Sequence, residues 1–358
     1  MTYVSVKALK NAASAAEVEG NVAVQILQVQ RKSTRTRKPY LEIVAGDAED
    51  RFAFKVWNDA PWYAEFAALQ PGETYSLCAR WRSGEYGMEA AGASLRPLSS
   101  EEEESFWSGS PALREKQMRD RQTVSELCAS VSDPRLRCLC RLFLERFGAL
   151  FERAAAARSY HHARRGGLVE HVACMMRCAF QICEAYPCLN RDLLLAGCLF
   201  HDCGKLWENN YGERDLVMPY AEMGEMLGHI AIGVEIVNKL WREALALPEA
   251  EEWKEMQPPS EQVRLHLLHL IASHHGELQF GSPVPPKTPE AVVLHHVDDL
   301  DAKLEMFRDA YETSPVLAPH IRQRRIPLPG NVIISLPKTR AAPGNPSGRE
   351  CGFSAEPS

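Results

Sequence analysis

An apolar helical stretch at residues 193–205 (LLLAGCLFHDCGK) limits the folds open to this chain, because it ends in adjacent histidine and aspartate residues. A neutral imidazole and a carboxylate side by side, His201 and Asp202, suit a borderline divalent cation. Gly204 lets the backbone turn away and leaves Lys205 close enough to meet an anion. The stretch therefore indicates a metal-dependent phosphate site, provided that the fold supplies further ligands.

Further candidate ligands occur in patterns that predict helices. His171 follows Gly166 and Gly167 in GGLVEHVACMM, whose apolar residues recur at helical spacing. Downstream, LGHIAIGVEIV places His229 near a helix start, LLHLIASHHGE ends a helix in two histidines, and AVVLHHVDDLDAKL places an aspartate inside a long helix. These last three candidates are His274, His275 and Asp298.

The order H, HD, H, HH, D resembles that of the HD-domain metallohydrolases. The surrounding text, HHARRGGLVEHV, HDCGK, LGHI and SHHGELQFGSPVPPKTPEAVVLHHVDDLDAK, is similar to their YhaM-type 3′-to-5′ exoribonuclease branch over roughly residues 20–312. The resemblance implies an enzyme that hydrolyses single-stranded RNA to nucleoside 5′-monophosphates with a metal-activated water. Single-stranded DNA stays open as a second substrate.

The resemblance also implies how the ligands are shared between ions. The simplest HD arrangement binds one ion through His171, His201, Asp202 and Asp298. Larger HD families with the same extra histidines imply a second site, completed by His229 and His274 and bridged by Asp202. We therefore expect one or two ions per chain. Mn²⁺ is the ion that the family favours, while mixed histidine and carboxylate ligands also accept Fe²⁺, Co²⁺ or Zn²⁺, and Mg²⁺ stays open.

Phosphodiester hydrolysis needs a nucleophile near pH 7, its alignment with the leaving oxygen, and neutralised phosphoryl charge. Divalent metal serves all three needs. Lys205, by its place in H-D-x-G-K, is expected to stabilise phosphate charge in the transition state, so Lys205 and Asp202 are the predicted catalytic residues. Cys203 offers a competing covalent chemistry beside Asp202, but no general base is placed for it. The sequence has neither a P-loop nor a Rossmann glycine signature.

Three other histidines near the predicted ligands each have two interpretations. His275 follows a predicted ligand and either supports the site or contacts substrate. His161 and His162 precede the first ligand, where the YhaM-type resemblance suggests a substrate role. The simpler alternative for this pair is a loop that caps the helix.

The predicted helix around Asp298 carries further polar residues. His295 lies one turn earlier, where it either orients that carboxylate or touches phosphate. Asp299 and Asp301 are expected to make helix-surface contacts or to support the ligands from outside.

Composition bounds the remaining possibilities. The formal charge of −6 excludes a uniformly basic coat, so a polyanion has to be drawn by a local patch or by bound metal. Eleven cysteines without close CxxC pairs, and no recognisable signal peptide, favour a reduced cytoplasmic setting. No apolar run reaches the roughly 20 residues of a membrane span, so we expect a soluble protein without a membrane partner. Oligomeric state is left open.

The N-terminal third has a different pattern, with short alternating runs separated by polar or Gly/Pro turns. Five predicted strands, with a short helix in DAPWYAEFAAL after the third, give the order of an OB-fold β-barrel. The sequence that follows has helical periodicity and predicts an all-α bundle. The resemblance implies that this bundle is the HD domain. We expect a lead-in at 1–19, an OB-fold nucleic-acid-binding domain at 20–98, a charged linker at 99–122, the HD metallohydrolase at 123–313 and a flexible tail at 314–358.

The predicted loop RKSTRTRKPY, between the first two strands, borders the binding groove of an OB fold. Its candidate RNA-binding residues are Arg31, Lys32, Arg35, Arg37, Lys38 and Tyr40. In RFAFKVW, period two sends Lys55 and Trp57 to the face opposite Phe52 and Phe54, which makes them candidates for contact with a ligand. Tyr86 is another stacking candidate. The alternatives are a solvated hairpin and half-buried barrel aromatics.

We therefore predict a metal-dependent exoribonuclease that binds single-stranded RNA through its OB domain. One alternative is an HD phosphohydrolase of nucleotides or cyclic dinucleotides. Another is a nucleic-acid-binding protein whose HD centre is only structural, although a structural centre has no need of Lys205.

Overall fold

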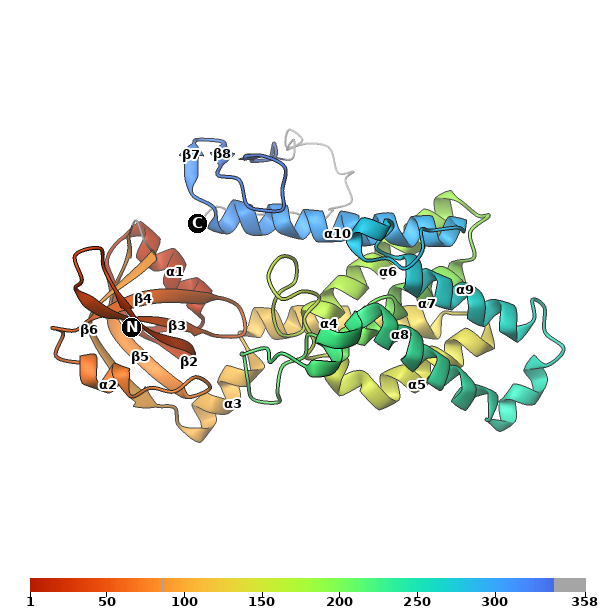
Figure 1. Cartoon of the computed structure of the whole chain (residues 1–358), viewed down its shortest axis with the longest axis horizontal. Coiled ribbons are helices and arrows are strands. Elements are labelled where there is room, and N and C mark those ends of the chain that lie inside the picture. Colours follow the sequence, from red (N-terminus) through yellow and green to blue (C-terminus); the bar gives the residue numbers. More distant parts are fainter. Residues whose placement is uncertain (85–86, 338–358) are drawn as a thin grey trace, which may run out of the picture. The chain divides into compact units, whose positions relative to one another are not determined.

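The computed structural model of this chain describes residues 1–84 and 87–337. It divides between Glu305 and Met306 into two compact units. The first unit contains an antiparallel sheet and a helical bundle, each with its own hydrophobic core (Figure 1). This arrangement confirms the predicted fold class, an OB-type β-domain followed by an all-α HD domain.

The sheet has the strand order β4-β3-β2-β5-β6, with antiparallel neighbours throughout. Its strands are β2 (Val18–Ser33), β3 (Pro39–Gly46), β4 (Arg51–Trp57), β5 (Thr74–Gly84) and β6 (Gly87–Pro97). The outermost strands β4 and β6 also contact each other, so the sheet curls into a barrel. The short helix α2 (Tyr63–Ala67) lies between β4 and β5 in the chain, as the OB order requires.

Alternation in β4 fills the barrel core, with Phe52 and Phe54 buried as predicted. Both rings meet Trp81 edge-on, at centroid distances of 5.3 and 5.8 Å. The buried Trp81 indole N–H donates to the Gly20 carbonyl at 3.0 Å, so the barrel buries this large ring without losing a hydrogen bond.

The segment predicted as a lead-in forms β1 (Thr2–Tyr3), which pairs parallel with β2, and α1 (Val6–Ala15). The segment predicted as a charged linker forms α3 (Ser100–Ser108) and the start of α4 (Pro111–Ala129). Ser99 and Glu102 make a capping box on α3, and Ser110 caps α4 directly before a proline, so local chemistry starts both helices.

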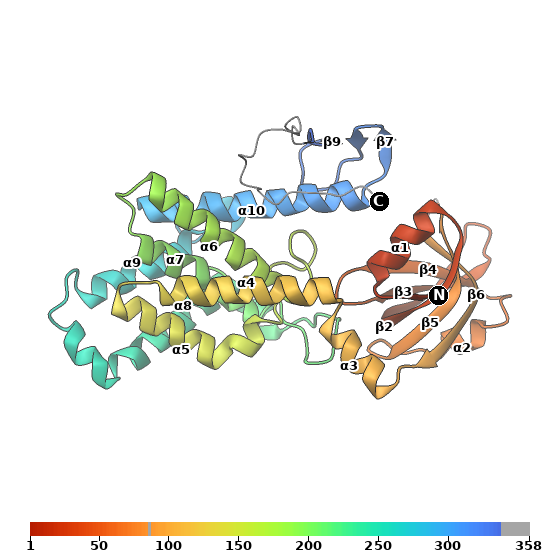
Figure 2. The same cartoon turned by 180° about the vertical axis from the view of Figure 1, so that it is seen from behind.

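The helical domain is built around α7 (Arg191–Phe200), in which every residue from Leu193 onwards is buried. This helix contacts α5 (Pro134–Phe151), α6 (Gly167–Ala185) and α9 (Ser260–Ser273). The domain is completed by α8 (Glu222–Leu245) and α10 (Pro289–Thr313), and α4 runs alongside α6 (Figure 2). A helix that is apolar all round has to lie at the centre of a bundle, so α7 delivers its last residues to the interior.

The second unit contains a small sheet of β7 (Val316–Ala318), β8 (Ile321–Arg322) and β9 (Val332–Ile333). The expected flexible tail therefore starts with ordered structure, and its residues 338–358 lie outside the described part of the chain, as does Tyr86. Among the described helices, none is long and apolar enough to cross a membrane.

Candidate metal centre and nucleic-acid surface

Five helix segments of the bundle converge on one buried centre, the fifth being α10 with Asp298. His171 lies in the second turn of α6, His201 and Asp202 end α7, and His274 caps the C-terminus of α9. His229 follows a kink at Gly228 (φ +69°), so it starts the second segment of α8.

Close approach of two backbones brings His229 to the centre. A Cβ built on Gly204 would lie 1.9 Å from the His229 carbonyl oxygen. Only glycine allows the turn after His201 and Asp202, the 3₁₀ helix η1 (Cys203–Leu206), to approach α8 this closely.

Asp202 stands between two groups of histidines. Its Oδ2 lies 3.2 Å from His201 Nε2 and 4.0 Å from His171 Nε2. Its Oδ1 lies 3.5 Å from His229 Nε2 and 3.6 Å from His274 Nε2. Asp298 Oδ1 adds a further carboxylate oxygen 3.2 Å from His171 Nε2. The structure thus brings together all six residues predicted as metal ligands.

Five of the potential metal-binding atoms at this centre are buried and lack hydrogen-bond partners among the described residues. They are the Nε2 atoms of His171, His201, His229 and His274, together with Oδ1 of Asp202. A buried polar atom without a partner costs about 1–3 kcal/mol, so five in one place call for a ligand. Imidazole nitrogens and carboxylate oxygens that converge in this way fit a divalent metal.

In each of the four histidines, Nδ1 hydrogen-bonds an acceptor, which leaves Nε2 as the ring nitrogen that faces the centre. Two acceptors are backbone carbonyls and two are carboxylates. The pairs are His201 with Cys198 O (2.9 Å), His274 with Ile271 O (2.7 Å), His229 with Glu208 Oε2 (2.9 Å) and His171 with Asp301 Oδ2 (2.7 Å). This pattern places a proton on Nδ1 and turns the Nε2 lone pair toward Asp202.

Lys205 lies at the same centre. Its ammonium donates to Asp202 Oδ2 at 2.6 Å, and both residues are buried. Burial opposes ionisation of Asp202, but Lys205 and His201 hold the pKa of its carboxyl well below the usual range. Asp202 is therefore an ionised acceptor with one oxygen facing each histidine group.

His171 holds a proton strongly when metal is absent. Burial opposes its protonation, but the carboxylates of Asp298 and Asp301 outweigh burial and raise the pKa of His171 to about 10. Burial likewise opposes ionisation of Asp298, whereas His171 and His201 hold the pKa of that carboxyl below its usual range. A metal has to displace the His171 proton, so its affinity falls as pH falls.

The remaining predicted histidines surround the ligands. His275 makes a 2.7 Å hydrogen bond through Nδ1 with the Phe280 carbonyl, and His295 Nδ1 does the same with the His274 carbonyl at 2.8 Å. His295 thus supports the backbone of a predicted ligand. A substrate contact by either residue stays a prediction.

The pair His161 and His162 separates into two environments. His162 is buried and hydrogen-bonds Asp301 Oδ2 through Nε2 at 2.9 Å. His161 has a buried Nδ1 without a partner among the described residues, and its ring centroid lies 5.7 Å from that of His171. Burial and the Lys205 ammonium lower the pKa of His161 to about 3, so its imidazole is neutral.

The basic segment of the sheet domain is a hairpin rather than a long loop. Arg31 and Lys32 belong to β2, Tyr40 belongs to β3, and only residues 34–38 form the turn. Backbone pairing between β2 and β3 continues through this polar segment, because the polar side chains face solvent and need no apolar core. Arg35 and Arg37 are exposed in the turn, and Lys32 pairs with Glu42 at 2.5 Å.

Aromatic and cationic side chains interleave beside this hairpin. The rings of Tyr40 and Trp57 lie 5.4 Å apart. The Lys38 ammonium lies 5.1 Å from the Trp57 ring, and the Lys55 ammonium lies 5.4 Å from the Tyr40 ring. This cluster combines stacking faces with positive charge, the combination that binds single-stranded nucleic acid.

A groove of about 440 Å³ continues from this cluster over β4, β5 and β6. Lys55 and Trp57 line it together with Arg80 and Arg82, which sequence reasoning missed. The missed signal was alternation, because buried Trp81 between two arginines sends both to the opposite face.

The sequence is similar to that of a known family of HD-domain proteins. Residues 168–303 match the HD domain family. The chain is 32% identical over 283 residues to the 3′-5′ exoribonuclease YhaM of Bacillus subtilis (strain 168), covering 77% of this chain and 82% of that protein. This chain belongs to the YhaM family.

Other members of the YhaM family are similar to this chain over comparable or shorter stretches. The Bacillus licheniformis protein of the same name is 38% identical over 189 residues (53% of this chain, 55% of that protein). The Oceanobacillus iheyensis protein is 29% identical over 290 residues (80% and 85%). No solved structure was found that matches this chain significantly.

As a YhaM family member this protein is an enzyme, a hydrolase of the HD superfamily. HD domains are metal-dependent, and the matched segment spans every predicted metal ligand from His171 to Asp298.

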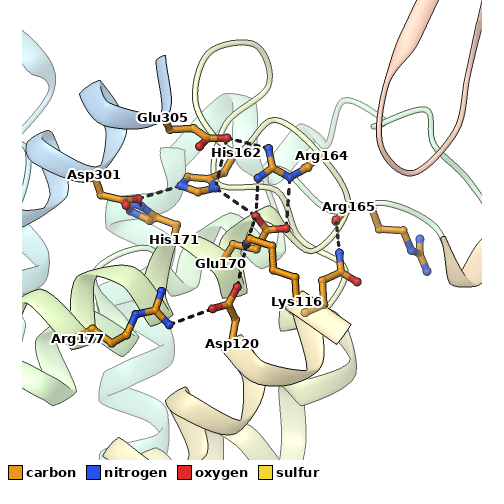
Figure 3. Close-up of polar contacts among 11 residues, drawn as sticks. Lys116, Asp120, His162, Arg164, Arg165, Glu170, His171, Arg177, Asp301 and Glu305 are labelled. Atoms are coloured by element: carbon orange, nitrogen blue, oxygen red, sulfur yellow. Dashed lines mark hydrogen bonds and ion pairs between the residues drawn. The ribbon is translucent and has the colours of Figure 1, made fainter. Parts of the chain in front are cut away.

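The chain also contains polar residues around the centre that sequence reasoning missed. Glu208 contacts His229 from 21 residues away, and no spacing rule links the two. Glu170, next to His171 in sequence, is buried among Arg164, Lys116 and His162 (Figure 3). A glutamate on a helix face that is otherwise apolar was the available signal for this network.

Proposed function

We propose that this YhaM family enzyme is a metal-dependent 3′-to-5′ exoribonuclease that shortens single-stranded RNA and releases nucleoside 5′-monophosphates. The observation that carries the proposal is the convergence of five buried, unpartnered donor atoms around Asp202. The relatives' name, 3′-5′ exoribonuclease, supports the direction and the RNA substrate. Single-stranded DNA is a second candidate substrate.

Six residues would hold two ions. One ion would be held by His171, His201, Asp202 and Asp298, and the other by Asp202, His229 and His274. A divalent ion bound here would lower the pKa of water and neutralise charge on the phosphoryl oxygens. We propose Mn²⁺ as the preferred ion, and the same ligand types also suit Fe²⁺, Co²⁺ and Zn²⁺.

The protein's own side chains supply the rest of the chemistry. Lys205, buried and held 2.6 Å from Asp202, provides a fixed positive charge that stabilises charge developing on the phosphate. Its position is set before substrate arrives, so little reorganisation is needed during the reaction. The neutral imidazole of His161, with its unpartnered Nδ1, contacts the substrate beside His171.

Substrate capture is assigned to the sheet domain. Trp57 and Tyr40 offer ring faces to the bases, while Lys38, Lys55 and the turn arginines meet phosphates. With a net charge of −6, a polyanion has to be attracted by such a local patch or by bound metal.

Digestion of a 5′-labelled single-stranded RNA with Mn²⁺ tests the proposal. A ladder that shortens from the 3′ end is expected with the native protein and with Asp299→Asn, a surface variant on α10 whose native carboxylate pairs with Lys303. The ladder should vanish with EDTA and with Asp202→Ala. Intact RNA under every metal, with RNA binding retained, would overturn the proposal and direct the search to free nucleotides and cyclic dinucleotides.

A further inference from the structure

The four histidines around Asp202 are held in two different ways, and each proposed ion position has one histidine of each kind. On each side of Asp202, one histidine is oriented by a backbone carbonyl and the other by a carboxylate. We propose that Asp301 and Glu208 are positioning residues, each of which orients one histidine and sets the affinity of one ion position. The inference rests on the two-ion arrangement proposed above.

Asp301 serves the position on the His171 side. Its Oδ2 accepts from His171 Nδ1 at 2.7 Å and from His162 Nε2 at 2.9 Å (Figure 3). An ionised carboxylate can only accept, so each imidazole donates a proton to it. With Nδ1 of His171 held by Asp301, Nε2 is the ring nitrogen that faces Asp298 and Asp202 and that a metal would bind on displacing its proton.

A buried ion-pair network holds Asp301 and His162 in place. Arg164 bridges Glu170 and Glu305 at 2.5 and 2.8 Å, and His162 Nδ1 lies 3.7 Å from Glu170 (Figure 3). His162 also has a left-handed backbone (φ 46°), a conformation that persists only where the surroundings enforce it. The second donor to Asp301 is therefore held in a buried, charged environment.

Glu208 serves the position on the His229 side. In sequence, Glu208 follows the 3₁₀ turn that carries Lys205. Its Oε2 lies 2.9 Å from His229 Nδ1. The N-terminal segment of α8 packs against it, since a Cβ built on Gly224 would lie 3.0 Å from the Glu208 Cα. Glu208 is 26% exposed, whereas Asp301 is 9% exposed and shared with a second histidine. Solvent can partly replace Glu208, so we expect its loss to have the smaller effect.

Charge distinguishes these two acceptors from the two carbonyls. A carboxylate makes a charge-assisted hydrogen bond that is about twice as strong as a neutral one and makes the imidazole a better metal ligand. Loss of such an outer partner typically lowers metal affinity about 10–100-fold. Asp301 and Glu208 should therefore act separately, each on its own ion.

Calorimetric titration of Mn²⁺ into the metal-stripped full-length protein tests this assignment. The native protein should bind two ions. Asp301→Asn should weaken one binding step about 10–100-fold, and Glu208→Gln should weaken the other about tenfold. The two steps are assigned with ligand variants, because Asp298→Asn should affect the same step as Asp301→Asn, and His274→Gln the same step as Glu208→Gln.

Surface carboxylates on the same helices provide matched controls. Asp299→Asn on α10 and Glu225→Gln on α8 should leave both steps unchanged, because both carboxylates are solvent-exposed. Enzymatic activity gives a second readout, since an effect on affinity alone shifts half-activation to higher Mn²⁺ while kcat at saturating Mn²⁺ is retained. Asp301→Glu, which keeps the charge on the same helix face, should lose less affinity than Asp301→Asn.

Two unchanged binding steps in Asp301→Asn and Glu208→Gln would overturn the inference, as would weakening of the same step by both variants. A native protein that binds a single ion would also overturn it, whereas the nuclease proposal is decided separately by the RNA ladder. Circular dichroism checks folding. If Asp301→Asn does not fold, Asp301→Glu and Glu208→Gln carry the test, and unchanged steps in both reject the inference.

Discussion

The helical centre and the sheet surface both carry concentrated charge, but they hold it differently. At the centre, the side chains of Asp202 and Lys205 are 2% and 10% exposed and paired at 2.6 Å. On the sheet, Lys38 and Arg82 are 46% and 61% exposed. Buried charges keep a fixed geometry and escape screening by salt, while exposed charges are screened and mobile. Chemistry and RNA capture should therefore be separable by mutation.

Replacing Asp202 gives the largest expected effect and tests this separation. Asp202→Asn keeps the shape of the side chain but removes the charge between the two histidine groups, so hydrolysis should fall to the level of the EDTA control. RNA affinity, measured by gel shift, should be unchanged because the sheet surface is intact. A parallel loss of RNA binding would show that the two regions do not act separately.

Lys205→Met should lower kcat about 10²–10³-fold, as expected for loss of a fixed charge that stabilises the transition state. Bound Mn²⁺, measured by mass spectrometry, should be retained because Asp202 loses a competing cation. The matched control is Lys303→Met, since Lys303 pairs with Asp299 on the surface. If metal is lost along with activity, the role of Lys205 is to hold Asp202 rather than to meet phosphate.

Trp57→Ala should weaken RNA binding with little effect on kcat, because one stacked base contributes about 1–3 kcal/mol. Removing Lys38 and Lys55 should reduce the salt dependence of binding, by a slope of about 0.7 for each phosphate that the protein no longer neutralises. Tyr186→Ala, which removes an exposed aromatic of the helical domain, is the control. An unchanged salt slope would place the RNA-binding surface elsewhere.

The smallest effect on function is expected from Glu170→Gln, which should lower the stability of the fold by an amount that depends on pH. Burial opposes ionisation of Glu170, but His162, Arg164 and Lys116 hold its pKa well below the ordinary 4.5. Because the folded-state pKa is depressed, ionised Glu170 stabilises the fold above pH 4.5, and this contribution is lost as pH falls further.

The free energy of unfolding of the native protein should exceed that of Glu170→Gln by about 2 kcal/mol at pH 7. This difference should shrink below pH 4.5. Thermal unfolding at several pH values measures this difference. Glu115→Gln, which alters an exposed pair with Arg119, is the control. A stability difference that grows on acidification would contradict a stabilising role of ionised Glu170.

Features written into local sequence were predictable. The apolar run of α7 from Leu193 onwards forces His201 and Asp202 into the interior, and Gly228 breaks α8 directly before His229. Alternation in β4 likewise separated Phe54 from Trp57. Each of these inferences needs only the periodicity of one element.

Contacts between elements were not predictable in the same way. Asp301 was expected either at the helix surface or in support of the ligands, and its contacts with His162 and His171 are decided only once the bundle sets the rotation of each helix about its axis. The contact of Glu208 with His229 was not expected. The basic hairpin was expected as a long loop because its residues are polar, yet backbone pairing needs no apolar side chain at a solvated edge.

Anomalous X-ray diffraction from crystals grown with Mn²⁺ tests most directly whether the buried histidines form the metal centre of this enzyme. Two anomalous peaks that share Asp202 are expected, one among His171, His201 and Asp298 and the other between His229 and His274. Mn²⁺ bound only elsewhere, or Nε2 atoms that stay unligated while the protein hydrolyses RNA, would contradict the assignment of catalysis to this centre.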